Sequence, residues 1–476
     1  MRFLIQLNAL VFSILLIACH NQAKPLRTFS AINAAFNNGD LTTAVVWADS
    51  LLAFGNPDSM TSAHLKALVD QANRIKADFP LSGPEFENML KKEMGAVSIG
   101  DRNQWEHNNW LEGRIIDGTT HYFKRAIPNL KLILNSKSSS SMADHALDHQ
   151  DAFCLEHTAK IIHGSGKISL PVFPVKMKVS YQLTVEADAV PDGEIVRCWL
   201  PWPHENHQRQ SDVKLLNSSA AKYVIAADSV EQRSIYLEKI ASKGKPVVFD
   251  LEFEYVSKAQ YFNLGKPAKF SDNHLNQPIK RYTDEQPPQI VFTAEIKHLS
   301  DSLVQGISDP KEKVRQIYYW INDHVIWTGA LEYSIIPFIP GYVLCNRRGD
   351  CGMQTLLFMA MARYQKIPVK WQSGWMMHPG AVNLHDWCEV YYESIGWVPL
   401  DMSFNLQKSA NTAIKEFYIS GIDSYRLIVN DGIGSRLIPE KKFPRSEPYD
   451  FQRGEVEWMG GNLYFNQWSY HMEVQY

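Results

Sequence analysis

The stretch that decides the fold reads Arg-Arg-Gly-Asp-Cys-Gly at residues 347–352. The apolar residues that follow recur at helical spacing, namely Leu356, Leu357, Ala360 and Tyr364. This spacing predicts a helix that begins at Cys351 and is capped by Asp350. The positive end of a helix, with Arg347 or Arg348 nearby, favours the thiolate, which is the nucleophilic form of cysteine. Cys351 is therefore a candidate nucleophile. The alternative is a small buried residue, the commonest environment of cysteine.

Two aromatic-rich runs follow at residues 385–392 and 396–401, and a short turn separates them. They predict a β-hairpin in which His385 and Asp401 lie within two or three residues of cross-strand register. Asp401 can then orient the imidazole of His385, which takes the thiol proton of Cys351 and later gives it to the leaving amine. A single histidine in a strand is usually a packing or surface residue, so the specificity lies in the combination of three residues.

Residues 290–405 resemble the transglutaminase-like superfamily. The family pattern has Gly-x-Cys at a helix start, a Gly-Ile-Pro-like turn, His-x-Trp-x-Glu-x-Tyr and Gly-Trp-x-x-x-Asp, and it is met at residues 349–351, 366–368, 385–391 and 396–401. The resemblance implies a papain-like α+β core, in which a helix packs on an antiparallel sheet. It also implies that Cys351 is the nucleophile, His385 the general base and acid, and Asp401 the orienting carboxylate. Lys366 departs from the pattern, because the family usually has glycine there, and the departure concerns the turn.

The oxyanion hole is less specified by the sequence than the triad. The backbone N–H of Cys351 would be one donor, as the start of a helix allows. Trp327 is the candidate for the second, because it aligns with an aromatic residue ahead of the cysteine in relatives. The alternative for Trp327 is a core or cleft-wall tryptophan. Glu389 and Tyr391 share the strand face of the histidine, and we expect them to shape the cleft.

No metal and no cofactor is expected. Four zinc-type ligands, Cys345, Cys351, His378 and His385, lack the two close pairs that zinc sites use. A disulfide between Cys345 and Cys351 is the other alternative, and it would silence the nucleophile.

The N-terminus predicts export and a lipid anchor. Arg2 precedes an apolar stretch at residues 9–18, and Leu-Ile-Ala-Cys at residues 16–19 resembles the lipobox of bacterial lipoproteins. Residues 1–18 would then be a signal peptide, and Cys19 would be acylated. An ordinary secretion signal is the alternative. Since no acidic run follows Cys19, we expect a membrane-anchored protein of the bacterial cell envelope, on the periplasmic face of the outer membrane.

The 476 residues correspond to about three folded units. Helical spacing predicts a helical domain at residues 25–135, and a serine-rich stretch predicts a linker at 136–166. Alternating apolar residues predict a β-sandwich at 167–262. The catalytic core follows at 285–430, and strands at 431–476 are expected to pack on the body.

The composition and the site together restrict the function. With 48 basic and 51 acidic residues the net charge is −3, so no nucleic acid is expected as a partner. A cysteine triad attacks a carbonyl carbon and forms a thioester that water or an amine resolves. We expect hydrolysis of an amide bond in a peptide or protein substrate. Protein-glutamine acyl transfer and a non-catalytic binding lipoprotein are the alternatives.

Overall fold

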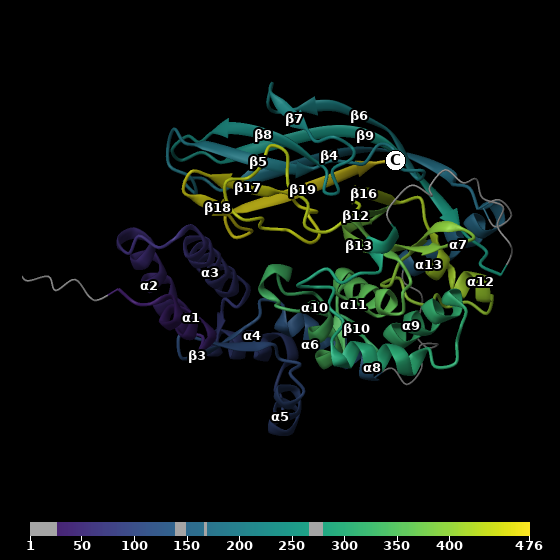
Figure 1. Cartoon of the computed structure of the whole chain (residues 1–476), viewed down its shortest axis with the longest axis horizontal. Coiled ribbons are helices and arrows are strands. Elements are labelled where there is room, and N and C mark those ends of the chain that lie inside the picture. The colour runs from purple at the N-terminus through teal and green to yellow at the C-terminus, as the bar shows by residue number, and fades with distance from the viewer. Residues whose placement is uncertain (1–25, 139–148, 166–168, 266–278) are drawn as a thin grey trace, which may run out of the picture. The chain divides into compact units, whose positions relative to one another are not determined.

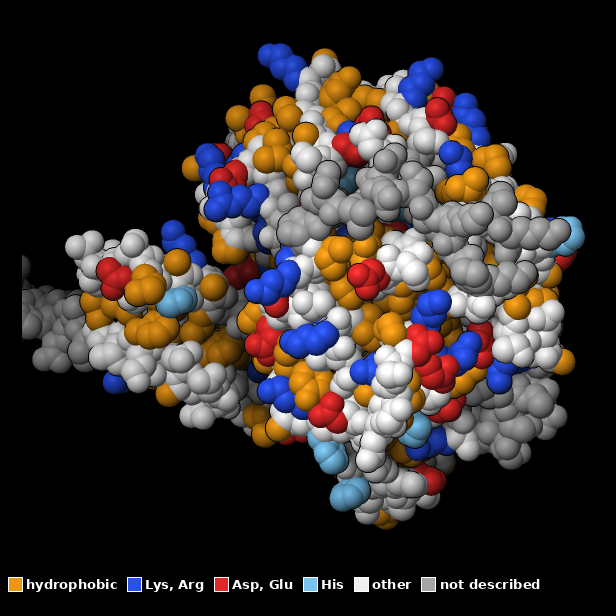
Figure 2. All heavy atoms as spheres, turned by 45° about the vertical axis from the view of Figure 1, so that its right-hand side comes forward, with side chains coloured by type: hydrophobic (Ala, Val, Ile, Leu, Met, Phe, Trp, Pro, Cys, Tyr) orange, Lys and Arg blue, Asp and Glu red, His pale blue; other side chains and the backbone are white. Residues whose placement is uncertain are grey.

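The computed structural model describes residues 26–138, 149–165, 169–265 and 279–476. Cys19 and the predicted signal peptide lie outside these residues. The chain divides into two compact units, residues 1–72 and 73–476. None of the described helices is long and apolar enough to cross a membrane. On the face shown in Figure 2, basic and acidic side chains are interspersed.

The first unit contains a helical hairpin, which agrees with the helical spacing at the start of residues 25–135. Helix α1 (Phe29–Asn37) begins where the hydroxyl of Thr28 accepts the backbone N–H of Ala31. Gly39, with φ of 85°, makes the turn into α2 (Leu41–Phe54). The two helices and the first part of α3 (Ser59–Asp78) bury one small apolar cluster that contains Ile32, Ala35, Ala44, Ala48, Leu65 and Leu68. Burial of these residues on one face of each helix is what the helical spacing predicts.

The next part of the chain is not purely helical, which corrects the sequence expectation for residues 25–135. Helices α4 (Gly83–Met94), α5 (Ile99–His107) and α6 (Ala126–Ser138) alternate with a three-stranded sheet of β1 (Leu81–Ser82), β2 (Gly113–Ile116) and β3 (Thr119–Tyr122). Asp117 and Gly118 connect β2 to β3, and both have positive φ. Asp-Gly between two strands is a strong local hairpin signal, and it outweighs the helical pattern there.

The predicted linker at residues 136–166 contains a helix, so that prediction was wrong for its second half. Helix α7 spans His149–Ser165. Its buried residues are Cys154, Thr158, Ile161 and Ser165. Spacings of four, three and four residues place them on one helical face. Two of the four buried residues are polar, so hydrophobic periodicity alone does not predict this helix.

Two five-stranded sheets form the sandwich. One contains β4 (Val172–Val185), β6 (Gln210–Ser218), β9 (Val247–Tyr261), β15 (Gly421–Ile422) and β19 (Trp468–Gln475). The other contains β5 (Ile195–Pro201), β7 (Tyr223–Ile225), β8 (Ser234–Ile240), β17 (Glu455–Trp458) and β18 (Gly461–Leu463). The predicted C-terminal strands therefore belong to these sheets: β19 pairs with β4, and β17 with β5.

The rest of the second unit is a helix packed on an antiparallel sheet. The sheet has the order β14 (Gly396–Leu400), β13 (Ala381–Tyr392), β12 (Val369–His378), β16 (Arg426–Asn430). Helix α11 (Cys351–Tyr364) contacts β13 and is almost entirely buried, and it also contacts α8 (Ala294–Leu303), α9 (Pro310–His324) and α10 (Ile339–Asn346). In Figure 1 these helices lie on one side of β12, β13 and β16, and the sandwich lies on the other. The predicted α+β fold class is confirmed.

Lys366 stands at the turn between α11 and β12. Its φ of 62° lies in the left-handed region, which glycine adopts without strain. The departure from the family pattern is therefore confined to the backbone of this turn.

Candidate active site

Helix α11 begins at Cys351, as predicted. The carboxylate of Asp350 accepts the backbone N–H of Met353 at 3.1 Å and so caps the helix. The hydroxyl of Tyr333 donates to the same carboxylate at 2.5 Å. Gly352 leaves room for this arrangement, because a Cβ there would lie 2.3 Å from the Tyr333 hydroxyl. The start of the helix and the sulfur beside it are therefore fixed by side chains from outside the helix.

The hairpin of β13 and β14 brings His385 and Asp401 together. Cys388 pairs with Leu400, so Asp401 directly follows the last paired residue. The imidazole Nε2 of His385 lies 2.7 Å from Oδ2 of Asp401, and both side chains are buried. Burial lowers the pKa of His385, and Asp401 offsets this only in part. A neutral imidazole bonded through Nε2 has Nδ1 left to accept a proton.

Asp401 has a second partner that sequence reasoning missed. Arg426 on β16 donates from Nη1 to Oδ2 of Asp401 at 2.8 Å and from Nη2 to Asp423 at 2.7 Å. Burial opposes ionisation of Asp401, but His385 and Arg426 outweigh it and lower the pKa of Asp401. The signal in the sequence is an arginine that starts a strand and is followed by three apolar residues. Its partner cannot be read from that pattern.

The sulfur of Cys351 contacts a carboxylate that the sequence reading did not single out. The thiol donates to Oδ2 of Asp386 at 3.4 Å. Oδ1 of Asp386 accepts a hydrogen bond from Gln452 at 2.7 Å. Burial raises the pKa of Cys351 well above its ordinary value, and the negative charges of Asp386 and Asp350 raise it further. The resting sulfur is therefore a thiol.

The two arginines before the helix do not activate this thiol, which corrects the sequence reasoning. Arg348 is buried against Glu112, with Nη2 3.3 Å from the carboxylate. The guanidinium of Arg347 lies over the ring of Trp320. Neither side chain lines a cavity that contains Cys351. The local environment of the sulfur is negative where the sequence suggested positive charge.

Two cavities open onto Cys351. The smaller has a volume of about 240 Å³ and is lined by Asp386, and the larger has a volume of about 540 Å³ and is lined by His385. Successive side chains of a strand point in opposite directions, which explains why these two neighbours face different cavities. Trp327 lines both cavities and is 39% exposed. It belongs to β10 (Ile326–Trp327), which pairs in parallel with β11 (Arg348–Gly349).

Glu389 and Tyr391, which were expected to shape the cleft, line neither of these cavities. Glu389 is buried in a network of ion pairs with Lys370 and Arg209, at 2.9 and 2.8 Å. Burial opposes its ionisation, but Lys370 leads the charges that hold the pKa of Glu389 well below its ordinary value. The role of Glu389 is therefore to join strands of the core to the sandwich.

Cys345 and Cys351 are both free thiols, and Cys345 is exposed. Within the part of the chain that the structure describes, no group of three or more histidine, cysteine or acidic residues is arranged to hold a metal ion.

Residues 297–402 match the family model described as Transglutaminase-like superfamily. No curated protein matches the chain. Among solved structures, a "Putative Cysteine Protease" from Cytophaga hutchinsonii is similar with 14% identity and a TM-score of 0.44, over 64% of this chain and 91% of that one. The periplasmic domain of TgpA from Pseudomonas aeruginosa is similar with 13% identity and a TM-score of 0.28, over 52% of this chain and 90% of that one.

Proposed function

From the transglutaminase-like core at residues 297–402, we propose that this chain is a cysteine-dependent hydrolase that cleaves an amide bond in a peptide or protein. Cys351 is the nucleophile, His385 the general base and acid, and Asp401 the carboxylate that orients the histidine. The observation that supports this assignment is the 2.7 Å contact of His385 with Asp401 beside a cavity that also contains Cys351.

The chemistry follows from the two ring nitrogens of His385. Asp401 holds Nε2, so Nδ1 takes the proton of the Cys351 thiol as the sulfur attacks the carbonyl carbon. The C–N bond then breaks, and the imidazolium gives its proton to the leaving amine. Water, deprotonated by the same ring, attacks the thioester and releases the acid and the free thiol.

Activation requires a movement of the sulfur. The thiol proton is held by Asp386 in the resting site, and a transfer to Nδ1 of His385 needs the Cys351 side chain to turn away from that carboxylate. The backbone N–H of Cys351 is one donor to the developing oxyanion, and the indole N–H of Trp327 is the candidate for the second. Trp327 lines both cavities beside the sulfur, which supports this role.

The test uses a mixture of peptides of known sequence. The purified protein and its Cys351→Ala variant are incubated with the mixture, and new peptide termini are identified by mass spectrometry. New termini that the wild type makes and Cys351→Ala does not make support the hydrolase. The same incubation with a fluorescent primary amine distinguishes acyl transfer, because the amine would become attached to glutamine side chains. A protein that gives neither product, although correctly folded, contradicts the enzyme and favours a binding protein.

We also propose that the chain is lipid-anchored at Cys19 in the bacterial cell envelope, facing the periplasm. The lipobox-like sequence at residues 16–19 supports this proposal. If acylation is the anchor, Cys19→Ser releases the protein from the membrane fraction. Retention of the variant in that fraction would contradict it.

A further inference from the structure

The two cavities beside Cys351 are chemically different, and this difference determines the orientation in which a substrate binds. His385 lines the larger cavity and not the smaller one. In the proposed reaction the imidazolium of His385 protonates the leaving amine, so the amine must lie within hydrogen-bonding reach of that ring. The leaving part of the substrate therefore occupies the larger cavity. The acyl part, which stays on the sulfur, is left with the smaller cavity of about 240 Å³.

The smaller cavity contains more acidic than basic side chains. Its carboxylates belong to Glu332, Asp350, Asp386, Glu447 and Asp450, and its cations to Lys124, Arg125 and Arg453. Arg453 already pairs with Glu447 at 2.7 Å and with Glu332 at 3.2 Å. Lys124 pairs with Asp78 at 2.8 Å, outside the lining. Two of the three cations, Arg453 and Lys124, are thus paired with carboxylates, and the charge of Arg125 acts on Asp350.

Asp386 and Asp450 form no ion pair with any residue that the structure describes. Asp386 is 2% exposed, and among the described residues its carboxylate accepts hydrogen bonds from the thiol of Cys351 and the amide of Gln452. The carbonyl of Asp450 accepts bonds from Ser373 and Asn430, but its carboxylate accepts none within the described residues. Burial raises the pKa of Asp386 well above its ordinary value, and the charge of Asp450 raises it further. Two carboxyl groups therefore face one cavity without an ion pair among the described residues. Burial raises the pKa of both, and a bound cation would favour their ionised forms.

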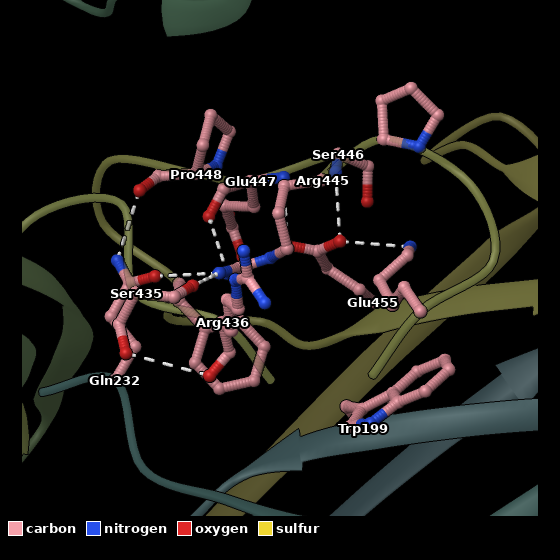
Figure 3. Close-up of polar contacts among 12 residues, drawn as sticks. Trp199, Gln232, Ser435, Arg436, Arg445, Ser446, Glu447, Pro448 and Glu455 are labelled. Carbon is pink, nitrogen blue, oxygen red and sulfur yellow. Dashed lines mark hydrogen bonds and ion pairs between the residues drawn. The ribbon is translucent and has the colours of Figure 1, made fainter. Parts of the chain in front are cut away.

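The wall that carries Asp450 is held rigidly from behind. Arg445 donates to the carboxylate of Glu455 at 2.6 Å and to the amide oxygen of Gln232 at 2.8 Å (Figure 3). The carboxylate of Glu455 in turn accepts the backbone N–H groups of Ser446 and Glu447. A wall fixed in this way keeps its carboxylates in place before the substrate arrives, which reduces the cost of binding.

We propose that the smaller cavity is the subsite for the acyl part of the substrate and that it selects a primary ammonium group, which binds at Asp386 and Asp450. This proposal rests on the proposed function, because it uses His385 to orient the substrate. The ammonium belongs either to a lysine-type side chain or to a free amino terminus next to the scissile carbonyl. Its charge also offsets the carboxylates that keep Cys351 protonated, so binding of the correct substrate favours the thiolate.

The test uses three small chloromethyl ketones that alkylate a cysteine nucleophile after their carbonyl occupies the acyl position. N-acetyl-lysyl chloromethyl ketone carries a side-chain ammonium, norleucyl chloromethyl ketone carries a free α-ammonium, and N-acetyl-norleucyl chloromethyl ketone carries neither. The second-order rate of labelling at Cys351 is measured by mass spectrometry for the wild type, for Asp450→Asn and for Glu252→Gln. Glu252→Gln is the matched control, because it removes a carboxylate of the sandwich that pairs with Lys178.

We expect one of the two cationic ketones to label wild-type Cys351 at least about tenfold faster than the uncharged one, as for a charge-assisted contact. The ratio of the labelling rates of the faster cationic ketone and the uncharged ketone should fall to about threefold or less in Asp450→Asn. In Glu252→Gln this ratio should stay at the wild-type value. The faster cationic ketone identifies the source of the ammonium. Equal rates for all three ketones in the wild type would overturn the subsite, even if Asp450→Asn did not fold. A preference for the cationic ketone that survives in folded Asp450→Asn would also overturn it.

Iodoacetamide, which needs no subsite, separates this proposal from the function. Selective labelling of Cys351 by iodoacetamide, together with equal rates for the ketones, would overturn the subsite alone. If neither iodoacetamide nor any ketone labels Cys351 in preference to the exposed Cys345, the nucleophile itself fails, and the subsite fails with it.

Discussion

Asp386→Asn should make Cys351 more reactive, although the substitution lies at the active site. The carboxylate accepts the thiol hydrogen bond at 3.4 Å, and its charge contributes to the raised pKa of Cys351. A raised thiol pKa means less thiolate at any given pH. Removing the carboxylate charge therefore lowers the pKa of Cys351 and moves alkylation to lower pH.

The magnitude follows from the distance. Two unit charges about 4 Å apart interact by about 4 kcal/mol at an effective dielectric constant of about 20, which corresponds to about three pKa units. Burial and Asp450 raise the pKa of Asp386 itself and so oppose its ionised form, which makes the full Coulomb value an upper limit. We therefore expect the pKa of Cys351 to fall by about one to two units, and the alkylation rate at pH 7 to rise about 10- to 100-fold.

The assay measures iodoacetamide labelling at Cys351 between pH 5.5 and 9.5 by peptide mass spectrometry, with the exposed Cys345 as the internal reference. Glu252→Gln serves as the control for loss of a carboxylate elsewhere, and melting temperatures show whether each variant is folded. A folded Asp386→Asn protein that is labelled at the wild-type rate or more slowly would refute the reasoning, because Asp386 would then not hold the thiol in its protonated form.

Asp401→Asn should lower kcat/KM by about 10²- to 10³-fold. It should also lower the melting temperature, because it weakens the buried contact with Arg426. Activity within threefold of the wild type would remove Asp401 from the mechanism. Gly352→Ala should abolish activity and destabilise the protein by about 1–3 kcal/mol in chemical denaturation, because the new Cβ would lie 2.5 Å from a carboxylate oxygen of Asp386; an active, stable variant would contradict this geometry. Glu455→Gln should destabilise the protein by about 3–5 kcal/mol at pH 7, because it leaves the buried cation of Arg445 poorly paired. Arg445 and Lys441 hold the pKa of Glu455 below its ordinary value despite burial. The stabilisation that Glu455 provides is therefore present above the unfolded pKa of about 4.3 and is lost as pH falls through the folded pKa. A difference in melting temperature between Glu455→Gln and the wild type that does not shrink below about pH 4 would contradict this.

The parts of the site that local signals specify could be predicted from the sequence. Asp350 before Cys351 is a capping signal, and two aromatic runs around a short turn are a hairpin signal, so the helix start and the approach of His385 to Asp401 followed from neighbours in the chain. The same reasoning overlooked the strands on either side of Gly118, because a weak helical period was preferred to a strong turn signal.

The partners that determine the charge of the site could not be predicted in the same way. Arg426 reaches Asp401 from 25 residues away, and Gln452 reaches Asp386 from 66 residues away. Such contacts depend on strand order and on the direction of a side chain within the folded core, neither of which leaves a local pattern. The protonation state of a cysteine follows from all charges around it, so the sequence gave a candidate nucleophile but the wrong sign for the charges that surround it.

The C-terminal strands of the sandwich have a consequence for biosynthesis. The hydroxyl of Tyr181 on β4 donates to the carbonyl of Arg453, which is 272 residues later in the chain, and the wall of the smaller cavity belongs to that later segment. Ribosomes make the residues of the candidate triad first and this wall afterwards. Contacts between such distant segments form late, since closing the long loop between them is entropically costly. An unfinished chain therefore has Cys351 and His385 but an incomplete smaller cavity. Under the proposed function, such a chain would not yet bind and cleave the proteins around it.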